Sequence, residues 1–304
     1  MKILHTADWH LGQTFYEYDR REEHFHFLEW LKQQIKQHEI DVLLIAGDVF
    51  DSPNPSAESQ RVYYRFLREV TSENPSLQIV IIAGNHDSAA RLEAPNPLLE
   101  DMNIIVRGTV RRNAEGDIDL QHFIVPLYTE GKVTAYCLAV PYLRQGDYPS
   151  AENYSKGVQQ LYEQLFNKVK EKGIPVVAMG HLQATGSEIS EDDRSERTVI
   201  GGLECVSPDA FNEAITYTAL GHLHRSQRVS HRENVRYSGT PMPMSFAEKN
   251  NASGVVMVTI DTEGTNIEKL EFQPLAGLVS IPSEARPLEE VLQVIGELPD
   301  GDVT

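Results

Sequence analysis

Two stretches of the sequence decide the fold, DVLLIAGD at residues 41–48 and QIVIIAGNHD at residues 78–87. Each is a short apolar run, rich in β-branched residues, that ends in glycine and then in a polar side chain. Short apolar runs that end in glycine favour buried β-strands over helices. Three further segments share the apolar run and the polar end, namely residues 2–8 (KILHTAD), 174–181 (IPVVAMGH) and 215–224 (ITYTALGHLH). We therefore expect five strands of one design.

Amphipathic stretches separate these strands. Apolar residues recur at helical spacing in residues 22–38, 56–70 and 157–172, so we expect three helices that cover a sheet. Strands that alternate with helices indicate an α/β fold. Later segments, at residues 229–237, Gly254–Asp261 and 267–273, read as antiparallel strands between turn signals.

The end of the chain differs from the rest in its pattern of apolar and polar residues. We expect one domain over residues 1–272, with a mobile, charged surface loop at residues 187–197. Residues 273–304 read as the beginning of a second, smaller domain, with a strand at 278–281 and a helix at 287–298 that starts with proline. The chain stops at Thr304 just as this unit begins, so we expect it to be truncated.

The composition excludes several classes of protein. Of the 304 residues, 40% are hydrophobic and 24% charged, an ordinary globular mixture, and no apolar run approaches membrane-spanning length. Lys and Arg number 27 against 45 Asp and Glu, and the formal charge of −18 is unsuitable for coating nucleic acid by bulk electrostatics. It still permits a nucleic-acid enzyme with local or metal-mediated contacts. Only two cysteines and no signal-peptide pattern predict a reduced, cytoplasmic protein.

Polar side chains follow each of the five strands. In α/β folds, ligands bind beyond the carboxyl ends of strands, so these side chains should line one pocket. The donors are carboxylate, amide and imidazole groups without a thiolate, a mixture that suits Mn²⁺, Fe²⁺ or Zn²⁺ more than Ca²⁺. The candidate ligands are Asp8, His10, Asp48, Asn85, His181, His222 and His224.

Seven donors exceed what one ion needs, but they suit two ions if one carboxylate bridges. Two ions about 3.5–4 Å apart can activate water and stabilise the in-line displacement of a phosphoryl group. His86, which follows Asn85, is then available as an acid for the leaving oxygen. The other histidines fit none of these positions and are assigned to surface, helix or core: His5, His24, His26, His38, His122 and His231.

These motifs resemble those of the calcineurin-like metallophosphoesterase superfamily. Its pattern of D-x-H, G-D-x-x-D, G-N-H-D/E, G-H and G-H-x-H stands here in order from Asp8 to His224. Longer matches, among them ILHTADWHLGQ at residues 3–13 and YSGTPMPMSFAE at residues 237–248, are similar to its bacterial DNA-repair nucleases. The resemblance implies a four-layer α/β/β/α sandwich that is followed by a small α+β capping domain.

The resemblance also assigns roles at the site. Two Mn²⁺ ions are implied, with Mg²⁺, Fe²⁺ or Zn²⁺ as alternatives. Asp8, His10, Asp48 and His224 hold one ion, and Asp48, Asn85, His181 and His222 hold the other. His86 matches the catalytic histidine. Asp87 is either the orienting partner of His86 or a salt-bridge or helix-capping residue, and Asp51 either caps the following helix or orients a neighbour.

The implied activity is 3′→5′ exonuclease action on duplex DNA and endonuclease action on single strands and hairpins, together with a partner ATPase. The chain has no G-x-x-x-x-G-K-[ST] loop of its own. A homodimer is implied through helices at residues 56–70 and 89–102, with these apolar candidates: Tyr63, Phe66, Leu67, Leu92, Leu98 and Leu99. Those residues would otherwise face their own sheet.

The negative charge requires a local basic surface for DNA. The candidates are Arg20, Arg21, Arg91, Arg107, Arg111, Arg112, Arg225 and Lys249, and Arg225, directly after His224, is the preferred phosphate contact. Two other functions compete with the nuclease. A metallophosphatase for small nucleotides could use the same ions, and a catalytically dead scaffold would show a broken ligand set, whereas all seven donors are present.

Overall fold

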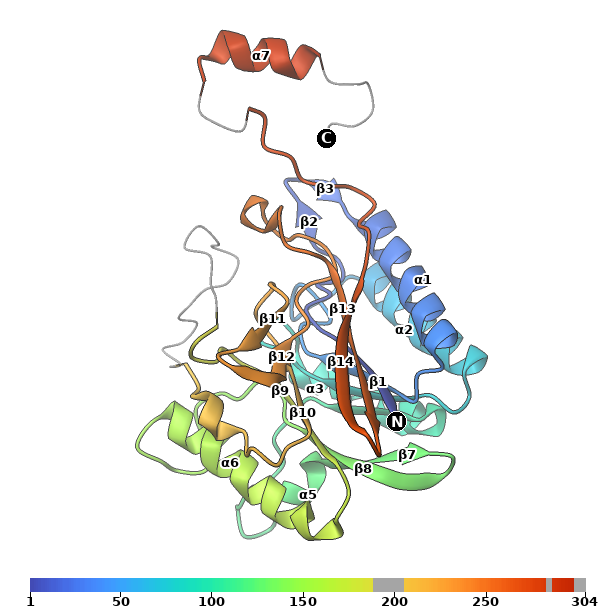
Figure 1. The fold of residues 1–304 in the computed structure, drawn as a ribbon, viewed down its shortest axis with the longest axis vertical. Coiled ribbons are helices and arrows are strands. Elements are labelled where there is room, and N and C mark those ends of the chain that lie inside the picture. Colours follow the sequence, from blue (N-terminus) through green and yellow to red (C-terminus); the bar gives the residue numbers. More distant parts are fainter. Residues whose placement is uncertain (188–204, 283–285, 298–304) are drawn as a thin grey trace.

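The computed structural model describes residues 1–187, 205–282 and 286–297, and its framework is a pair of six-stranded sheets (Figure 1). The first sheet has the order β14-β13-β1-β4-β5-β6. Its strands are β1 (Lys2–Thr6), β4 (Val42–Ala46), β5 (Gln78–Ile82), β6 (Ile104–Arg107), β13 (Gly254–Asp261) and β14 (Gly264–Glu271). β1, β4, β5 and β6 run parallel, while β13 pairs antiparallel with β1 and β14.

The second sheet has the order β11-β12-β10-β9-β8-β7. Its strands are β7 (Ile124–Thr129), β8 (Lys132–Ala139), β9 (Val176–His181), β10 (Tyr217–Gly221), β11 (Gln227–Val229) and β12 (Arg232–Tyr237). The four central strands are parallel, and antiparallel strands close both edges.

Helices cover the outer face of each sheet. On the first sheet, α1 (Arg21–His38) and α2 (Ala57–Glu73) pack their apolar stripes against β4 and β5. On the second, α6 (Tyr154–Val169), continued by η2 (Lys170–Lys172), does the same. The shorter elements are β2 (Thr14–Phe15), β3 (Tyr18–Asp19), α3 (Ala89–Glu93), α4 (Asn96–Leu99), η1 (Glu100–Met102), α5 (Leu120–Phe123), η3 (Pro208–Ala210), η4 (Phe246–Glu248) and α7 (Leu288–Gly296). The expected four-layer α/β/β/α architecture is confirmed.

The inner faces of the two sheets form a shared core. Along β4, Leu43 and Ile45 pack toward the helices, whereas Val42, Leu44 and Ala46 pack into the layer between the sheets. Side chains of a strand alternate between its faces, so a strand that is buried on both faces must be apolar throughout. This explains why the decisive sequence runs are continuous rather than alternating.

Some expected elements differ in the structure. Residues 229–237 form the end of β11, a turn and β12, because Ser230 adopts a left-handed backbone conformation with φ of +53°. β6, β7 and β8 were not predicted, and residues 278–281 form no strand. The predicted helix at 287–298 is present as α7, and most of the predicted loop at 187–197 lies outside the described residues.

The helices proposed for dimerisation pack mainly into their own subunit. Five of the six apolar candidates are buried in the core, and Leu98 is 75% exposed. None of the described helices has the length and apolar character needed to cross a membrane.

Candidate metal centre

The seven predicted donors come together at one end of the sandwich, where the strand ends of both sheets meet. Asp8 and His10 follow β1, Asp48 follows β4 and Asn85 follows β5, all in the first sheet. His181 is the last residue of β9, and His222 and His224 follow β10, in the second sheet. The site that the sequence predicted at a strand edge is therefore shared by two sheets.

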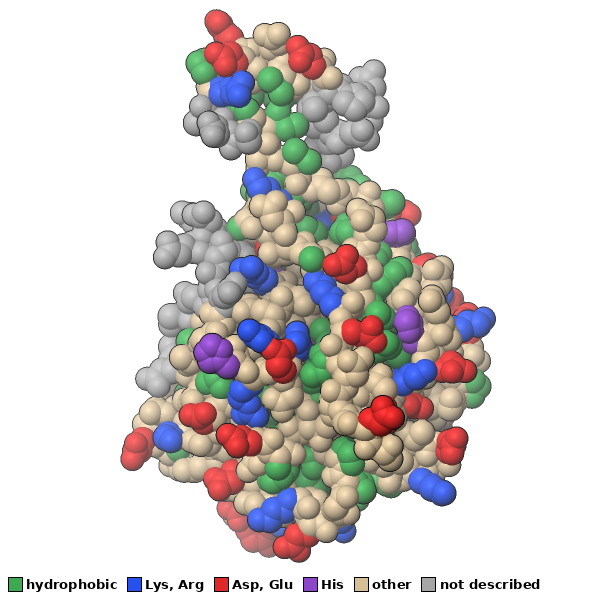
Figure 2. All heavy atoms as spheres, viewed as in Figure 1, with side chains coloured by type: hydrophobic (Ala, Val, Ile, Leu, Met, Phe, Trp, Pro, Cys, Tyr) green, Lys and Arg blue, Asp and Glu red, His purple; other side chains and the backbone are tan. Residues whose placement is uncertain are grey.

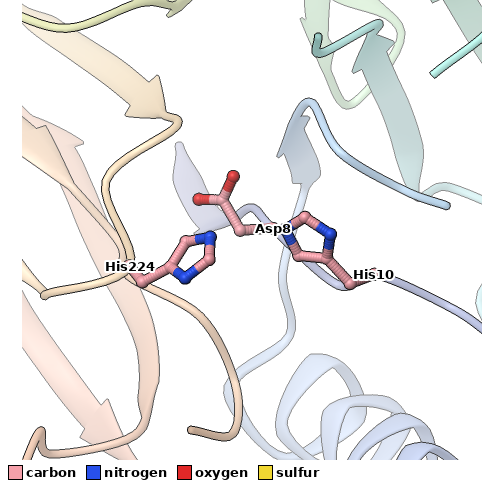
Figure 3. A group of neighbouring side chains, drawn as sticks. All are labelled: Asp8, His10 and His224. Carbon is pink, nitrogen blue, oxygen red and sulfur yellow. The ribbon is translucent and has the colours of Figure 1, made fainter. Parts of the chain in front are cut away.

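One group of donors surrounds the Asp8 carboxylate. Asp8, His10 and His224 each offer a ligand atom within 4.8 Å of the others, and all three are buried. Figure 3 shows the carboxylate of Asp8 between the two imidazole rings, whose centroids are 5.2 Å apart. These residues belong to the first predicted ion.

A second group surrounds Asp48. Asp8, Asp48 and His181 form another cluster within 4.8 Å, and His181 Nε2 lies 3.3 Å from Asp48 Oδ2. Asn85 Oδ1 lies 2.9 Å from His181 Nε2 and 3.1 Å from His222 Nδ1. Asp48 Oδ2 also lies 3.8 Å from His10 Nε2 of the first group, so this carboxylate lies between the two groups, as a bridging ligand requires.

Backbone strain accompanies these positions. Asp8, His10, Asp48 and His222 have φ angles of +55°, +47°, +49° and +103°, in a region that costs free energy for residues with a Cβ. Such outliers gather at functional sites because the surrounding structure enforces them. Gly84 permits the close approach, since a Cβ there would collide with the carboxylate of Asp48.

Backbone and carboxylate acceptors orient two of the imidazoles. His181 Nδ1 donates to the carbonyl of Ala46 at 2.8 Å, and His224 Nδ1 donates to Glu248 Oε1 at 2.9 Å. When these rings are neutral, Nδ1 as the donor leaves the lone pair on Nε2, as metal-ligating histidines require. Sequence reasoning missed Glu248 as a site residue, although it ends the matching segment at residues 237–248.

One buried nitrogen shows that these residues suit a cation. His10 Nε2 is buried, has no hydrogen-bond partner and lies 3.8 Å from Asp48 Oδ2. Buried polar atoms without partners are rare and costly, and a divalent ion would satisfy this one. The oxygen and imidazole donors agree with the metals that the sequence predicted.

The charges of the centre are strongly coupled. Burial raises the pKa of Asp8 to about 7, against the opposing influence of His181 and His224. Burial disfavours the charge on His181, but the adjacent Asp48 carboxylate outweighs it and raises the pKa of His181 to about 9. Burial and then His181 lower the pKa of His222 to about 3. Without metal, a proton on His181 therefore partly balances the carboxylates.

His86 lies at the rim of the centre. Its backbone N–H donates to Asp48 Oδ1 at 2.8 Å, and its ring Nδ1 lies 2.9 Å from the carbonyl oxygen of Asp51. Its ring centroid is 4.8 Å from that of His10. The half-buried imidazole is thus held beside the clustered donors.

The two neighbouring aspartates have roles different from some of those expected. Asp87 does not orient the ring of His86, because its buried carboxylate accepts from the backbone N–H groups of Val49, Phe50 and Gly84. It joins the loops that follow β4 and β5. Asp51 does not cap α2, whose N-cap is Ser56, but lies with Oδ1 3.4 Å from His10 Nδ1.

The remaining predictions concern histidines and basic residues. The six histidines assigned elsewhere belong to no metal-like cluster among the described residues, and His5, His24 and His122 are buried. Arg225 is exposed beside His224. Hydrogen bonds or ion pairs within the chain are made by these basic candidates, among others: Arg20, Arg21, Arg91, Arg107, Arg111, Arg112 and Lys249.

Several known proteins are similar to this chain. Residues 1–226 match the calcineurin-like phosphoesterase family. The chain is similar to the D subunit of the nuclease SbcCD from Rhodobacter capsulatus, with 38% identity over 98% of this chain and 76% of the relative. The corresponding protein of Escherichia coli K12 is 32% identical over 96% of this chain and 75% of its own length. A dimetal phosphatase structure from Danio rerio, at 13% identity, covers 89% of this chain and 98% of that one with a TM-score of 0.44.

The family match and the clustered donors together identify the class of protein. The chain is an enzyme, a metal-dependent phosphodiesterase.

Proposed function

Because the chain belongs to the calcineurin-like phosphoesterases and, within them, to the family formed by the D subunits of SbcCD nucleases, we propose that it cleaves DNA phosphodiester bonds with two divalent ions. The observation that carries the proposal is the convergence of seven oxygen and imidazole donors at the strand ends of the two sheets, with His86 beside them. The finer activity is 3′→5′ exonuclease action on duplex ends and endonuclease action on single strands and hairpins.

The ligand sets follow the two groups of donors. Asp8, His10, Asp48 and His224 would hold one ion, and Asp48, Asn85, His181 and His222 the other, both Mn²⁺ in this proposal. Bound ions supply Lewis-acid stabilisation of the charge that develops on the phosphate. The protein contributes rigid placement, because five of the seven ligand side chains are buried and four of the seven ligands have an enforced backbone conformation.

His86 supplies the proton in this proposal. With Nδ1 donating to the carbonyl of Asp51, the ring presents Nε2 as its other protonation site. A protonated Nε2 beside the scissile phosphate donates to the leaving 3′ oxygen, a role worth roughly 10²–10⁴-fold in rate. Its backbone bond to Asp48 ties this donor to the metal ligands.

The proposal also covers the partners of the protein and its location in the cell. The names of the relatives describe one component of a two-protein complex, so we assign the other component, SbcC, as the ATPase partner and DNA as the substrate. A homodimer and a cytoplasmic, nucleoid-associated location rest on the family resemblance. Leu98, exposed on α4, is available for a dimer contact.

Replacement of His86 by Gln tests the catalytic assignment. We expect unchanged Mn²⁺ content, an unchanged melting curve, retained DNA binding and cleavage that is roughly 10²–10⁴-fold slower, since glutamine cannot deliver a proton at neutral pH. Metal analysis, thermal melting and cleavage of a labelled duplex by the protein with SbcC measure these effects. His231→Gln, at an exposed position, is the matched control. Near-normal cleavage by the His86 variant would refute the assignment, and hydrolysis of small nucleotide esters without DNA cleavage would favour the small-molecule phosphatase.

A further inference from the structure

An exposed cluster of aromatic rings lies on two segments of the chain that lead to the metal centre. The hairpin of β2 and β3 begins four residues after His10, and its two-residue turn is Tyr16-Glu17. Phe15 and Tyr16 have ring centroids 5.0 Å apart, and Phe246 of η4 lies 5.4 Å from Phe15 and 6.0 Å from Tyr16. Tyr16 is 81% exposed and Phe246 43% exposed. We call Phe15, Tyr16 and Phe246 the aromatic platform.

The backbone beneath the platform is strained. Tyr16 and Glu17 have φ angles of +47° and +71°, the conformation of a hairpin turn that normally favours Asn-Gly. A bulky side chain in this region costs stability, and Tyr16 places that side chain in solvent rather than in the core. Strain that holds an exposed aromatic ring at a loop tip points to a function for the ring.

The platform is anchored firmly to the fold. The guanidinium of Arg20 lies 5.5 Å from the centroid of Phe15 and donates to the carbonyl of Pro243 at 2.6 Å. Arg20 is itself buried and bonded to Glu23. The hairpin and the segment that carries Phe246 are therefore held side by side, as Figure 1 shows for β2, β3 and the neighbouring chain.

The anchored segment also leads to the metal centre. Phe246 and Glu248 lie in the same short helix, and Glu248 accepts from His224 Nδ1 at 2.9 Å. On the other side, Phe15 is five residues beyond His10. The two segments that carry the platform rings, the β2–β3 hairpin and η4, thus continue directly into residues of the candidate site.

The net negative charge of the molecule disfavours electrostatic attraction of DNA, and aromatic rings can bind bases without it. On the face shown in Figure 2, Lys and Arg side chains lie interspersed with acidic ones. Most of the basic candidates near the motifs are engaged within the chain, and the net charge is −18. Stacking on an aromatic ring is tolerant of sequence and does not depend on positive charge, so it can hold a nucleic acid where electrostatic attraction is weak.

Resting on the proposed nuclease function, we propose that the aromatic platform stacks unpaired bases of single-stranded DNA beside the metal centre. Three rings are far too few for a stable protein interface, which needs about 20–30 residues on each side, but they match one or two bases. The platform would select ends and hairpins whose bases are already unpaired, because a paired base offers no free face to it.

The test measures stacking directly. A short oligo-dT that contains one 2-aminopurine serves as the probe, with metal chelated to prevent cleavage, and a blunt duplex serves for comparison. We expect Tyr16→Ala and Phe246→Ala to weaken single-strand binding by about 5- to 150-fold per stacked base lost and to relieve the 2-aminopurine quenching seen with the unmodified protein. Tyr16→Trp should restore both signals. Tyr128→Ala removes a ring that is 44% exposed on β7 and should change neither.

Further readouts separate this inference from the nuclease assignment. Hydrolysis of bis(p-nitrophenyl) phosphate by the unmodified protein with Mn²⁺ tests the phosphodiesterase site without a base to stack, so a failure there counts against the proposed function alone. Unchanged single-strand affinity and quenching in the platform variants would overturn the platform. It would also be overturned by equal losses on single strands and blunt duplex, or by a loss confined to binding of purified SbcC.

Discussion

The layer between the two sheets and the carboxyl ends of the same strands use buried histidine in opposite ways. His5 lies on β1 inside the sheet interface, where Nδ1 is 2.8 Å from the Tyr217 hydroxyl and Nε2 is 3.2 Å from the carbonyl of Leu220. His181 lies at the end of β9 beside Asp48. Both side chains are almost completely buried.

Their surroundings set their charge. Burial lowers the pKa of His5 to about 3 against the opposing influence of the Leu220 carbonyl, and no carboxylate of the described residues counteracts it. The pKa of His181 rises to about 9 because carboxylates outweigh the same burial. Burial alone therefore does not make a histidine functional; the neighbouring charges decide whether the ring is structural or available to a cation.

The largest test removes the central carboxylate of the strand-end region. Asp48→Asn should abolish the binding of at least one ion and reduce cleavage by at least about a thousandfold, because the middle ligand of both groups loses its charge. Metal titration calorimetry and the duplex assay measure this. Asp101→Asn, on the exposed η1, is the control and should behave like the unmodified protein. Full metal content in the Asp48 variant would show that this carboxylate is not what distinguishes the strand ends from the layer between the sheets.

A smaller effect is expected from the acceptor behind His224. Glu248→Gln keeps the size of the side chain but weakens its hold on the imidazole, so metal affinity should fall by about 10–100-fold. Titration calorimetry with Mn²⁺ gives the affinity, and the melting curve of the metal-free protein checks the fold. Glu263→Gln, exposed in the turn between β13 and β14, is a suitable control. If affinity is unchanged while stability falls, Glu248 acts only in the fold.

The smallest expected effect is on the pH dependence of the free energy of unfolding, and it comes from His5 in the layer between the sheets. With a folded pKa of about 3 and an ordinary unfolded value, His5 binds fewer protons when folded, so its stabilisation is complete above about pH 6.5 and is lost as pH falls toward 3. The loss should approach about 1.4 kcal/mol per pH unit in this window. His5→Gln should flatten the dependence in denaturant titrations of the metal-free protein, and His231→Gln should not. An unaltered slope in the His5 variant would mean that its ring is not held neutral.

Much of the metal centre at the strand ends could be predicted from the sequence, because each of its motifs lies within a few consecutive residues. Glycine and a polar residue directly after an apolar run mark each of the strands that end near Asp48, Asn85, His181 and His222, and the structure brings these residues together. The division of the strands between two sheets was predicted only through the family resemblance. Periodicity says that a strand is buried on both faces, but not which sheet it joins.

Other features depend on contacts between distant segments. Glu248 reaches His224 from a separate loop, and Asp87 joins the backbone of two loops rather than the ring of His86. The turn between β2 and β3 is Tyr16-Glu17, without the Asn-Gly sequence from which such turns are predicted. A pattern of residue types does not report which carboxylate faces which donor, so these pairings appear only in three dimensions.

The division of the site between two sheets has a mechanical consequence. Asp8, Asp48 and Asn85 are attached to strands of the first sheet, whereas His181, His222 and His224 are attached to strands of the second. The layer between the sheets is mostly apolar, and a few polar contacts such as that of His5 with the Tyr217 hydroxyl also cross it. A small shear of one sheet over the other would change the separation between these two sets of ligands at once. The packing of the two sheets against each other is therefore also what sets the spacing of the donors in the metal centre.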